Sequence, residues 1–589
     1  MQTLNNVHEQ FAEFFKGKHF RPFAHLLSKK LSEGHICLSL KEMISEEVEI
    51  ASRYTTLTEL EKQLADEHIV GMTSADNQPF VVHNSHLYIQ RYYYYETLIF
   101  ERIKDFVFQE TEEMQHRIEL INLHRDFIKG FSVDEELADT LSEEEKVDWQ
   151  LVGAILGFLN NFTIITGGPG TGKTTTVSKI LKLLKHIDPN LKIGIAAPTG
   201  KAAMRLAESL EGETPTTIHR MLKTIYGSHH FKHNRENPLD FDLIIVDEAS
   251  MIDVALFAKL LDAIRPNTRL ILLGDKDQLA SVEAGSLFRD LCQIQENMNV
   301  ISAEKAKLIN SLRNSVSQGL PDKFVSDRPL HFLSDHIVEL KRSRRFDSKK
   351  GIGKLSKAII LNRTESLDEL FEPAPDNQVQ LVSDFDLFSL RDFINGYECY
   401  IKEADTYKAL EKFNELRILC AVRGGDHGLY QINKLVEDEL KSRRLIDTDT
   451  EFYNNRPIII TKNYYDLELY NGDIGIIRPD ANNKLMAWFA DGEGGLRAVI
   501  PGLLAEAETV FAMTVHKSQG SEYNSVLIVI PDLEDSQLLT RELLYTAITR
   551  AKLKVTLMAS KEAIVTMMNR TVKRVSGIKD RFNLEIERN

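Results

Sequence analysis

The sequence predicts an α/β protein with two parallel-sheet domains, a small all-β insertion in the second of them and a mostly helical N-terminal domain. Short apolar strands alternate with helical segments from about residue 161 and again from about residue 416, which is the pattern of βαβ units in a parallel sheet. Between residues 457 and 500, four short strands are separated by turn residues such as Asn471-Gly472 and Asp491-Gly492. This spacing favours a small barrel inserted into the second α/β domain.

The expected elements are apolar runs bounded by turn residues. The first parallel sheet is predicted to contain Phe162–Thr166, Lys192–Ala197, Leu243–Val246 and Arg269–Leu273. The second is predicted to contain Leu416–Leu419, Ser525–Ile530 and Lys554–Met558, and the insertion Pro457–Ile460, Asp473–Ile477, Leu485–Phe489 and Arg497–Ile500. The N-terminal region is helical in pattern, apart from one extended piece between Phe80 and Ile89.

Three domains are expected, at residues 1–125, 126–335 and 336–589. A short hairpin insertion is predicted near 224–240 and the barrel near 452–508. The charged segment from Asp134 to Lys146 is predicted to be a solvated boundary. This division agrees with the chain length of 589 residues, which is too long for a single hydrophobic core.

Composition excludes several classes of protein. The four cysteines lie far apart without a C-x-x-C pair, which excludes an all-cysteine metal site and a disulfide framework. No apolar run approaches the ~18–20 residues of a membrane span, so a cytoplasmic chain is expected. The formal net charge of −15 argues against a passive DNA-coating protein. It says little against a protein that needs only a narrow basic track along phosphates.

The segment Gly167–Thr174 fits the phosphate-binding pattern G-x-x-x-x-G-K-[ST]. A predicted strand precedes it and a predicted helix follows it, which is the context in which glycines let backbone N–H groups surround phosphates. Lys173 is expected to reach the β- and γ-phosphates and Thr174 to hold Mg²⁺. A chance glycine-rich turn is the alternative, and the flanking strand and helix disfavour it.

Acidic residues follow two further strands of the same predicted sheet. Asp247 and Glu248 end the apolar strand 243–246, where a Mg²⁺-binding acid and a water-orienting acid are expected. Gln278 follows a later strand and is positioned to sense the γ-phosphate. For Gln278, an ordinary strand-to-loop turn is an equally good reading.

The second α/β domain contains two segments, Met513–Gly520 and Leu544–Lys552, that are not expected in a protein that only hydrolyses nucleotides. Arg550 could neutralise charge on a transferring phosphoryl group only when the two domains close. Hydrolysis would then depend on domain closure, as a motor requires. The alternative for Arg550 is a surface arginine in a salt bridge.

The ordered series of motifs resembles superfamily 1 helicases and, within them, the RecD family of subunits of the RecBCD (exodeoxyribonuclease V) complex. The series comprises the P-loop, Ala197–Ala203, Thr217–Arg220, Asp247–Met251, Gly274–Gln278, Ser343–Phe346 with Gly351–Gly353, Asn471–Gly475, Thr514–Gly520 and Tyr545–Lys552. The closeness to RecD beyond general helicase motifs depends on Gly34–Leu38 and Leu87–Glu96.

The resemblance implies two tandem RecA-like P-loop domains, an SH3-like barrel and a partner-binding N-terminal domain. It implies an ATP- and Mg²⁺-dependent 5′–3′ DNA helicase that unwinds DNA ends for double-strand break repair by homologous recombination. The implied partners are RecB-like and RecC-like subunits and DNA, both single strand and duplex end, in a bacterial cytoplasm. No cluster resembling a nuclease site is present, so the nuclease is expected in another subunit.

Two alternatives stay open. One is a stand-alone RecD-like helicase, which usually carries a longer N-terminal region. The other is a non-motor scaffold with a degenerate ATP site, against which Lys173, Asp247, Glu248 and Arg550 argue.

The resemblance also implies roles for individual residues. Gln150 would read adenine, and the nucleotide would lie on Gly167, Gly168, Pro169, Gly170, Thr171, Gly172, Lys173, Thr174 and Thr175. Gln278, Arg345 and Arg550 would face the γ-phosphate, and Thr199, His219, Thr514 and His516 would lie along the single strand. Arg344 stands where the family usually has an aromatic residue, which leaves open whether Arg344 or Arg345 enters the site.

Three further segments have competing interpretations. The histidines of His229–His233 could bind a metal, but an exposed strand-separating hairpin within Tyr226–Pro238 is preferred. The tyrosines Tyr92–Tyr95 could stack on bases, but packing inside the N-terminal domain or against a partner is favoured. The basic run Lys341–Arg345 is better explained as a phosphate sensor than as a nuclear-localisation signal.

Overall fold

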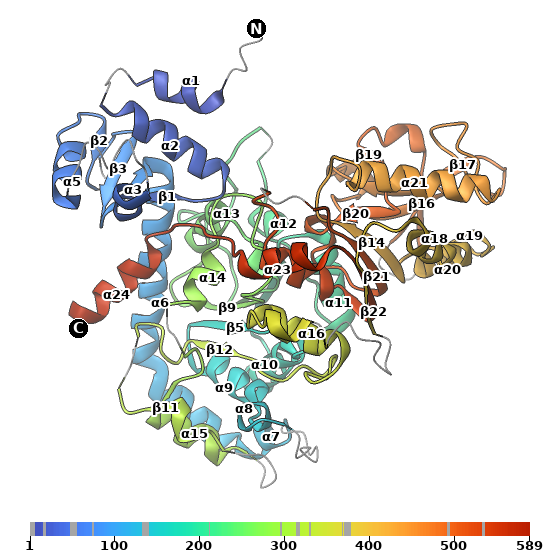
Figure 1. Ribbon diagram of the computed structural model, residues 1–589. Coiled ribbons are helices and arrows are strands. Elements are labelled where there is room, and N and C mark those ends of the chain that lie inside the picture. Colours follow the sequence, from blue (N-terminus) through green and yellow to red (C-terminus); the bar gives the residue numbers. More distant parts are fainter. Residues whose placement is uncertain are drawn as a thin grey trace.

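The structure is a computed structural model (Figure 1). It describes residues 6–588 except 16–18, 47–55, 74–75, 132–140, 211, 226, 295–296, 314–318, 329–330, 368, 370–377, 492–494 and 533–535. Most of the predicted charged boundary 134–146 lies outside the described residues; its end forms the short helix α8 (Glu143–Lys146). Among the described helices, none combines the length and the apolar character that a membrane span requires.

The N-terminal region combines helices with a four-stranded sheet. Its strands have the order β1 (Cys37–Ser39), β4 (His86–Ile89), β3 (Phe80–His83) and β2 (Val70–Gly71). Helices α1 (Val7–Glu13), α2 (Arg21–Ser32), α3 (Leu40–Glu46) and α5 (Leu57–Ala65) accompany this sheet. The extended piece predicted at 80–89 is a hairpin. The prediction of a mostly helical region missed the sheet, because β1 and β2 are only 3 and 2 residues long.

A single helix of 34 residues, α6 (Gln90–Leu123), connects the N-terminal sheet to the first parallel sheet. Figure 1 shows it running the length of both regions. Ile99, Ile103 and Phe106 are fully buried along it, and they belong to a core shared with the first parallel sheet. The helix is therefore a rigid connection between the two regions.

The first parallel sheet has six strands. Their order is β12 (Ile337–Glu339), β5 (Phe162–Thr166), β9 (Arg269–Gly274), β8 (Leu243–Val246), β6 (Ile193–Ala197) and β7 (Thr216–Thr217). All its pairings are parallel, and the four predicted strands are confirmed. One face packs against α9 (Trp149–Leu159), α10 (Lys173–Ile187) and α11 (Gly200–Ser209), the other against α6, α13 (Val254–Asp262) and α14 (Leu287–Cys292).

The second parallel sheet has five strands. Their order is β13 (Val379–Val382), β22 (Ala551–Met558), β21 (Tyr523–Val529), β14 (Leu416–Cys420) and β20 (Ala512–Thr514). The three predicted strands are confirmed, and all pairings are parallel. The chain therefore forms two α/β domains, each with its own parallel sheet, as expected from its two regions of strand–helix alternation.

The insertion between β14 and β20 is an antiparallel sheet of five strands. Their order is β18 (Leu496–Val499), β17 (Leu485–Ala490), β16 (Ile474–Pro479), β15 (Pro457–Ile460) and β19 (Ala507–Thr509). The four predicted strands are confirmed, and β19 was not predicted. β18 and β19 lie at opposite ends of the strand order, so the pairing given by the described residues is that of an open sheet.

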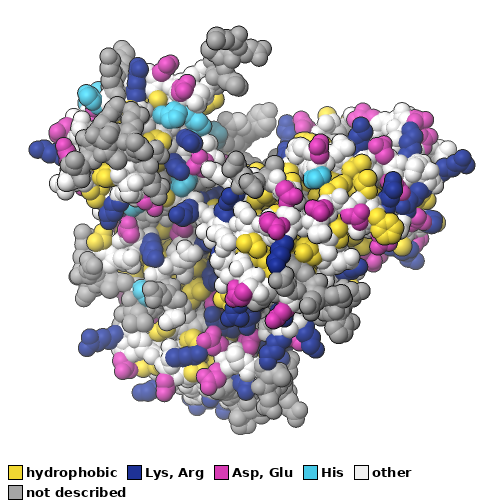
Figure 2. Space-filling view, in the orientation of Figure 1, with side chains coloured by type: hydrophobic (Ala, Val, Ile, Leu, Met, Phe, Trp, Pro, Cys, Tyr) yellow, Lys and Arg dark blue, Asp and Glu magenta, His cyan; other side chains and the backbone are white. Residues whose placement is uncertain are grey.

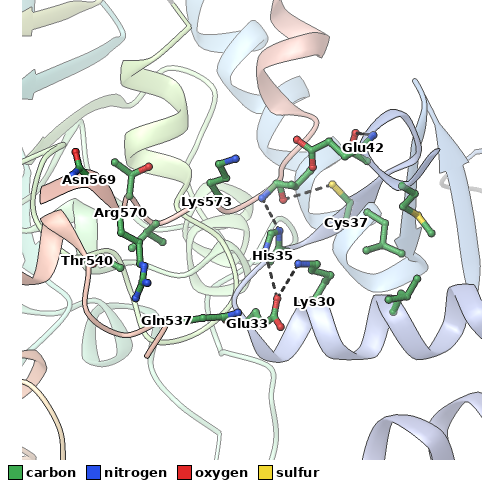
Figure 3. A pocket seen from close by; sticks show the side chains of 17 residues that line it. Lys30, Glu33, His35, Cys37, Glu42, Gln537, Thr540, Asn569, Arg570 and Lys573 are labelled. Carbon is green, nitrogen blue, oxygen red and sulfur yellow. Dashed lines mark hydrogen bonds and ion pairs between the residues drawn. The ribbon is translucent and has the colours of Figure 1, made fainter. Parts of the chain in front are cut away.

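The C-terminal segment returns to the N-terminal region (Figure 1). After α23 (Lys561–Asn569), residues 570–577 cross the molecule, and α24 (Ile578–Arg588) packs against α6 and α14. Val575 joins the two ends of the chain, because its carbonyl accepts from Ile36 N (3.2 Å) and its N–H donates to His35 Nδ1 (3.1 Å). Figure 3 shows a cavity of about 490 Å³ at this crossing, lined from the N-terminal side by Lys30 and Cys37 and from the C-terminal side by Arg570.

Candidate functional site

The loop between β5 and α10 requires glycine at two positions. Gly170 (φ +74°) and Gly172 (φ +89°) have left-handed backbones, and Gly172 is the N-cap of α10. A Cβ at Gly170 would lie 2.3 Å from Cβ of Arg345, and one at Gly172 would lie 2.1 Å from Nε2 of Gln150. Only residues without a side chain allow this backbone and this close approach.

Lys173 lies at the centre of this loop. Its ammonium donates to the carbonyls of Gly167 (2.6 Å) and Gly168 (3.3 Å), so it faces the curve of the loop. A helix N-terminus presents unpaired N–H groups, and together with an ammonium it forms a positively charged cradle. The loop therefore suits a chain of phosphates.

Gln150 packs against the same loop from α9. Its side chain is largely buried, and its Nε2 donates to the carbonyl of Thr171 (3.1 Å). Its Oε1 is buried and accepts no hydrogen bond from the described residues. A buried, unsatisfied acceptor beside the loop suits a ligand that carries an amino group.

Asp247 and Glu248 follow β8 at the edge of the sheet that carries the loop. Burial and the neighbouring Glu248 raise the pKa of Asp247 to about 6, while Lys173 acts in the opposite direction. Glu248 has a left-handed backbone (φ +52°), which a non-glycine residue adopts at a cost of about 1–3 kcal/mol. Two carboxylates and the nearby Thr174 hydroxyl are the oxygen donors that Mg²⁺ prefers.

The loop after β9 brings the two parallel sheets into contact. Asp275 is buried and accepts hydrogen bonds from Nε2 of Gln278 (2.9 Å) and from the hydroxyl of Tyr545 (3.1 Å). Gln278 Oε1 in turn accepts from Nη2 of Arg550 (2.9 Å). Gln278 thus lies in a turn, with its backbone and side chain bonded to Asp275, and it also connects the first sheet to Arg550 of the second domain. Tyr545, which lies 2.9 Å from a Cβ built at Gly168, was not predicted as a site residue.

Arg550 is buried at the interface between the sheets rather than exposed on a helix. Its Nη1 donates to the carbonyl of Ser521 (3.2 Å) and its Nε to the carbonyl of Thr546 (3.2 Å). Burial lowers its pKa, and Glu248 and Glu522 oppose that effect. The alternative of a surface arginine in a salt bridge is therefore wrong.

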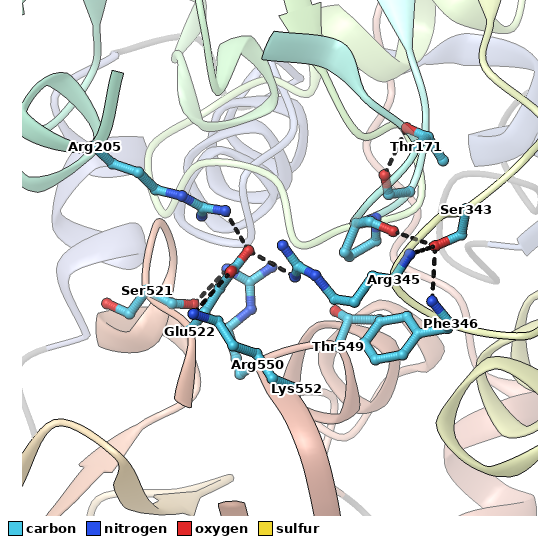
Figure 4. Close-up of polar contacts among 12 residues, drawn as sticks. Thr171, Arg205, Ser343, Arg345, Phe346, Ser521, Glu522, Thr549, Arg550 and Lys552 are labelled. Atoms are coloured by element: carbon cyan, nitrogen blue, oxygen red, sulfur yellow. Dashed lines mark hydrogen bonds and ion pairs between the residues drawn. The ribbon is translucent and has the colours of Figure 1, made fainter. Parts of the chain in front are cut away.

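Arg345 points into the interface, whereas Arg344 borders a separate cavity. Nη1 of Arg345 lies 2.7 Å from Oε1 of Glu522, as Figure 4 shows. The backbone N–H of Arg344 donates to the carbonyl of Gly170 (2.8 Å), and its side chain lines a cavity of about 710 Å³ beside the P-loop. The geometry thus favours Arg345 over Arg344 as the arginine that faces the second domain.

Two residues in the same interface were not predicted. Arg205 of α11 and Glu522, immediately before β21, form an ion pair across the two domains (Figure 4). Glu522 comes two residues after the predicted segment 514–520, which is the signal that could have identified it. Arg205 likewise comes two residues after the predicted segment 197–203, but it lies in an amphipathic helix, where a charged residue is usually solvated.

Thr199 and the segment Thr514–Gly520 lie close together. Thr199 caps α11, where its hydroxyl accepts from Ala202 N (3.3 Å). A Cβ at Gly520 would lie 3.9 Å from Oγ1 of Thr199. Thr514 ends β20, and its hydroxyl accepts a hydrogen bond from Lys517 N (3.3 Å). His516 lies two residues further along the chain. Burial is the largest cause that lowers the pKa of His516, and the charge of Arg574 lowers it further.

His219 follows the strand β7, whose Thr217 pairs with Ala197 of β6, two residues before Thr199. It is on α12 (Ile218–Leu222) beyond the edge strand β7, and its ring contacts that of Phe231 edge to face (5.7 Å). Burial is the main cause that lowers the pKa of His219.

The predicted hairpin segment has short-range pairing. Lys232 N donates to the carbonyl of Lys223 (2.9 Å), and Thr224 pairs with Phe231. Phe231 is packed, since the ammonium of Lys259 lies 5.6 Å from its ring centre.

Among the described residues, no group of three or more His, Cys, Asp and Glu is arranged to hold a metal ion.

The tyrosine-rich segment forms the first turns of α6. Tyr93 and Tyr95 are buried and Tyr94 is 45% exposed. The guanidinium of Arg581, from α24, lies 4.8 Å from the ring centre of Tyr93. The packing interpretation is confirmed for Tyr93 and Tyr95, and part of that packing involves the returning C-terminal segment.

A P-loop in one parallel sheet and a buried arginine from a second sheet define the two-domain motor of superfamily 1 helicases. Three family models match the chain: an AAA domain at residues 153–284, a UvrD-like helicase C-terminal domain at 509–558, and the N-terminal domain of RecBCD enzyme subunit RecD at 1–88. The RecBCD enzyme subunit RecD of Haemophilus influenzae is 35% identical over 482 residues, which cover 74% of this chain and 72% of that protein. The chain belongs to the RecD family of RecBCD enzyme subunits, and it is a helicase subunit.

Other similarities are consistent with this family. RecBCD enzyme subunit RecD of Mycolicibacterium smegmatis is 36% identical over 462 residues, covering 74% of each protein. The ATP-dependent RecD2 DNA helicase of Deinococcus radiodurans is 29% identical, over 72% of this chain but only 49% of that protein. A crystal structure of Pif1 helicase from Bacteroides with ADP-AlF3 and single-stranded DNA aligns over 73% of this chain and 94% of that one. Its TM-score of 0.36 and identity of 16% are too low to support a functional comparison.

Proposed function

We propose that this chain is the ATP-driven 5′–3′ helicase subunit of a RecBCD-type helicase–nuclease in the bacterial cytoplasm, unwinding duplex ends for double-strand break repair by homologous recombination. The observation that carries the proposal is the hydrogen bond between Arg550 of the second sheet and Gln278 of the first, beside the P-loop. A contact of this kind ties hydrolysis of ATP to closure of two domains. Polarity and partner subunits rest on family membership.

The nucleotide would be held by the loop and by α9. Backbone N–H groups from Gly170 to Thr175 and the ammonium of Lys173 would bind the phosphates, while the unsatisfied Oε1 of Gln150 would accept from the adenine amino group. The positive backbone φ angles of Gly170 and Gly172 support this assignment, because the loop can approach phosphate only without side chains.

Thr174 and Asp247 would hold Mg²⁺, which when bound neutralises charge on the phosphate oxygens. Glu248 would orient the attacking water through its carboxylate and take up its proton. The raised pKa of Asp247 supports a site built for a cation, because a buried carboxylate next to another carboxylate gains most from one.

Arg345 and Arg550 would stabilise the charge of the transferring phosphoryl group, and Gln278 would report its presence. Buried donors aimed at developing charge act more strongly than exposed ones, because water does not screen them. Arg550 is 3% exposed, which supports this role.

DNA would cross the carboxyl edges of both sheets, along Thr199, Thr514 and His516, with His219 near the hairpin 224–240. The face in Figure 2 carries acidic and basic side chains side by side, which fits a narrow strand path better than a broad basic surface. We assign residues 126–335, together with β12 and the segment through Arg345 that follows it, to one RecA-like motor domain, because β12 pairs with β5 of the first sheet. The predicted boundary at residue 336 therefore lies too early in the chain. We assign the following residues up to 589 to a second RecA-like motor domain and the insertion at 452–508 to an SH3-like barrel. Residues 1–125 would bind the RecB-like and RecC-like partners.

A stand-alone helicase of the RecD2 kind is the second candidate. The match of the RecD N-terminal family model to residues 1–88 favours the subunit, as does the limited coverage of the Deinococcus radiodurans protein. Recovery of two large partner proteins with this chain from its own cells would support the subunit. Recovery of the chain alone would support the second candidate.

The test of the motor is Lys173→Ala, with Lys182→Ala on the exposed face of the same helix as the matched control. Loss of this ammonium is expected to lower DNA-stimulated ATP hydrolysis by roughly 10²–10³-fold and to abolish unwinding of a duplex with a 5′ single-stranded tail. Normal hydrolysis by Lys173→Ala would refute the ATP site. Unwinding of 3′-tailed duplexes alone would refute the polarity.

A further inference from the structure

Glu522 is a carboxylate of the second motor domain that contacts three cations. It lies 2.7 Å from Nη1 of Arg345, pairs with Nη2 of Arg205, and lies 3.8 Å from Nζ of Lys552. Its side chain is only 11% exposed. Figure 4 shows the carboxylate between the two guanidinium groups.

The two arginines come from the other domain. Arg205 is on α11, and Arg345 follows β12, so both belong to the first parallel sheet, whereas Glu522 directly precedes β21 of the second. Two guanidinium groups held near one another repel, and a carboxylate between them removes that repulsion. Burial alone would raise the pKa of Glu522, but Arg205 and Arg345 lower it, so the carboxylate is ionised.

One of these two arginines, Arg205, also interacts with the acidic residues of the ATP site. Arg205 pairs with Glu522 across the interface. Burial alone would lower the pKa of Arg205, but the charges of Glu522, Glu248 and Asp247 raise it, so its guanidinium also interacts with the charge of the acidic pair. Arg205 is therefore a third arginine beside the residues predicted for phosphoryl transfer.

The residues that precede Glu522 in the sequence also lie near Arg550 and near a residue proposed to bind single-stranded DNA. Ser521 accepts from Nη1 of Arg550 through its carbonyl (3.2 Å). Gly520 is the neighbour of Thr199 across the domains, where an added Cβ would lie 3.9 Å from the Thr199 hydroxyl. Of these three consecutive residues, Gly520 lies beside a candidate DNA residue, Ser521 accepts from Arg550, and Glu522 pairs with Arg345.

We propose that Glu522 is a positioning residue: when the motor domains close, its carboxylate sets Arg345 and Arg205 at the ATP site and makes hydrolysis depend on the strand-facing segment 514–520. This inference rests on the proposed function and deepens it. A carboxylate is suited to the task, because it can pair with two guanidinium groups at once and does so only when both domains are together.

The alternative is a purely structural ion pair, and the chain offers a matched control for it. Arg289 of α14 and Glu542 of α22 (Arg541–Ile548) form another ion pair between the same two domains, at 2.5 Å. Glu542 is 3% exposed and accepts from the N–H of Val572, which is in the C-terminal segment. Glu542→Gln therefore removes a buried interdomain charge that pairs with Arg289 and Val572 rather than with a residue assigned to the ATP site.

The experiment compares Glu522→Gln, Glu522→Asp, Glu542→Gln and Lys173→Ala in the full chain, alone and with its partners. For Glu522→Gln, kcat of DNA-stimulated ATP hydrolysis is expected to fall about tenfold or more, while KM for ATP and the Kd for single-stranded DNA change by less than about threefold. Glu522→Asp should restore part of kcat, and Glu542→Gln should leave kcat within about twofold. In a double-mutant cycle, Arg205→Gln should add little to Glu522→Gln, because the two side chains act as one unit.

Two outcomes would overturn the inference. One is an unchanged kcat in Glu522→Gln. The other is an equal loss of kcat in Glu522→Gln and Glu542→Gln together with a lower melting temperature in both, which would mark a structural pair. Either result leaves the proposed function standing as long as Lys173→Ala is inactive. Activity in Lys173→Ala would instead refute the proposed function itself.

Discussion

Gln278 of the first parallel sheet and Arg550 of the second are joined by a hydrogen bond of 2.9 Å in the buried interface beside the P-loop. The side-chain amide of Gln278 donates a hydrogen bond to the carboxylate of Asp275, which also accepts from the hydroxyl of Tyr545. The loop after β9 is therefore connected to the second domain both at Tyr545 on α22 and at Arg550 just after that helix. Movement of one domain relative to the other must break or reform these bonds, so the interface is suited to couple hydrolysis with domain motion.

Arg550→Ala is expected to separate binding from chemistry. The affinity for ATP should stay within about threefold, whereas kcat should fall by roughly 10²–10³-fold, because the guanidinium acts mainly on charge that develops in the transition state. Equilibrium binding of a fluorescent ATP analogue and steady-state hydrolysis with single-stranded DNA measure the two quantities. A loss of affinity as large as the loss of rate would show that Arg550 binds the ground state.

The hairpin segment 224–240 is expected to contribute to the separation of duplex DNA rather than to the binding of single-stranded DNA. Removing Ser228–His230 keeps Phe231, which packs against His219. This change should spare DNA-stimulated hydrolysis and lower the rate of duplex separation about tenfold, or ~1.4 kcal/mol of barrier. Fluorescence unwinding assays on a tailed duplex measure the second rate.

Thr514→Ala and His516→Ala should have the opposite profile, with weaker DNA stimulation and unchanged ATP binding. If the shortened hairpin separates duplexes at the normal rate, the strand-separating role is lost while the motor assignment stands. Zinc measured in the parent chain but absent from the shortened one would restore the metal interpretation.

The buried ion pair between Arg581 and Glu96 is expected to hold the C-terminal segment on α6. Glu96 is fully buried, lies 2.9 Å from Nε of Arg581, and accepts from the N–H of Gly577 (2.8 Å). Arg581→Ala leaves that carboxylate uncompensated, so it should cost about 3–5 kcal/mol. Hydrogen exchange at Gly577 N–H reports the local opening free energy.

Lys579→Ala, an exposed position two residues away, is the control and should change exchange at Gly577 by less than about 0.5 kcal/mol. Equal exchange in Arg581→Ala and the parent chain would contradict a role of this pair in docking α24.

The sequence predicted the parts of the site that depend on local pattern. The P-loop glycines, Asp247 and Arg550 each follow or precede an apolar run. The first sheet brings the P-loop and Asp247 together because its parallel strands end at one edge, and Arg550 reaches them from the second sheet across the interface. Tyr545 lies inside a predicted segment, and Arg205 and Glu522 lie just after two others, but their roles depend on contacts between residues more than 250 positions apart, which the motifs do not indicate.

The fold shows the same division between local and distant features. Strands of four or more apolar residues were predictable, whereas β1, β2 and β19 are short and form only where a neighbouring strand pairs with them. The return of residues 570–577 to the N-terminal sheet could not be inferred, because its hydrogen bonds with His35 and Ile36 connect the two ends of the chain. Contacts so distant in sequence leave no periodic signal.

Asp290 is expected to make the attachment of the C-terminal segment sensitive to pH. Burial raises its pKa to about 6, and Glu96 adds to the shift, whereas hydrogen bonds from Ser576 (2.7 Å) and Ser286 (3.1 Å) and the charge of Arg289 oppose it. Between pH ~4 and ~6 the folded protein keeps a proton that the unfolded chain has released, so folding stability falls as pH rises through this window. Above pH 6 the ionised carboxylate should cost about 3 kcal/mol.

Asp290→Asn removes this titration, and its amide resembles the protonated carboxyl. The single amide oxygen can accept from one of the two serines, and the amide N–H can donate to the hydroxyl oxygen of the other. The opening free energy at Gly577 in the variant should match that of the parent chain near pH 4, exceed it increasingly up to pH 6, and then stay above it by a constant amount. Asp580→Asn, on the exposed start of α24, should follow the parent chain at every pH. A difference between Asp290→Asn and the parent that does not change with pH would mean that Asp290 keeps one protonation state throughout, and the pH dependence would be absent.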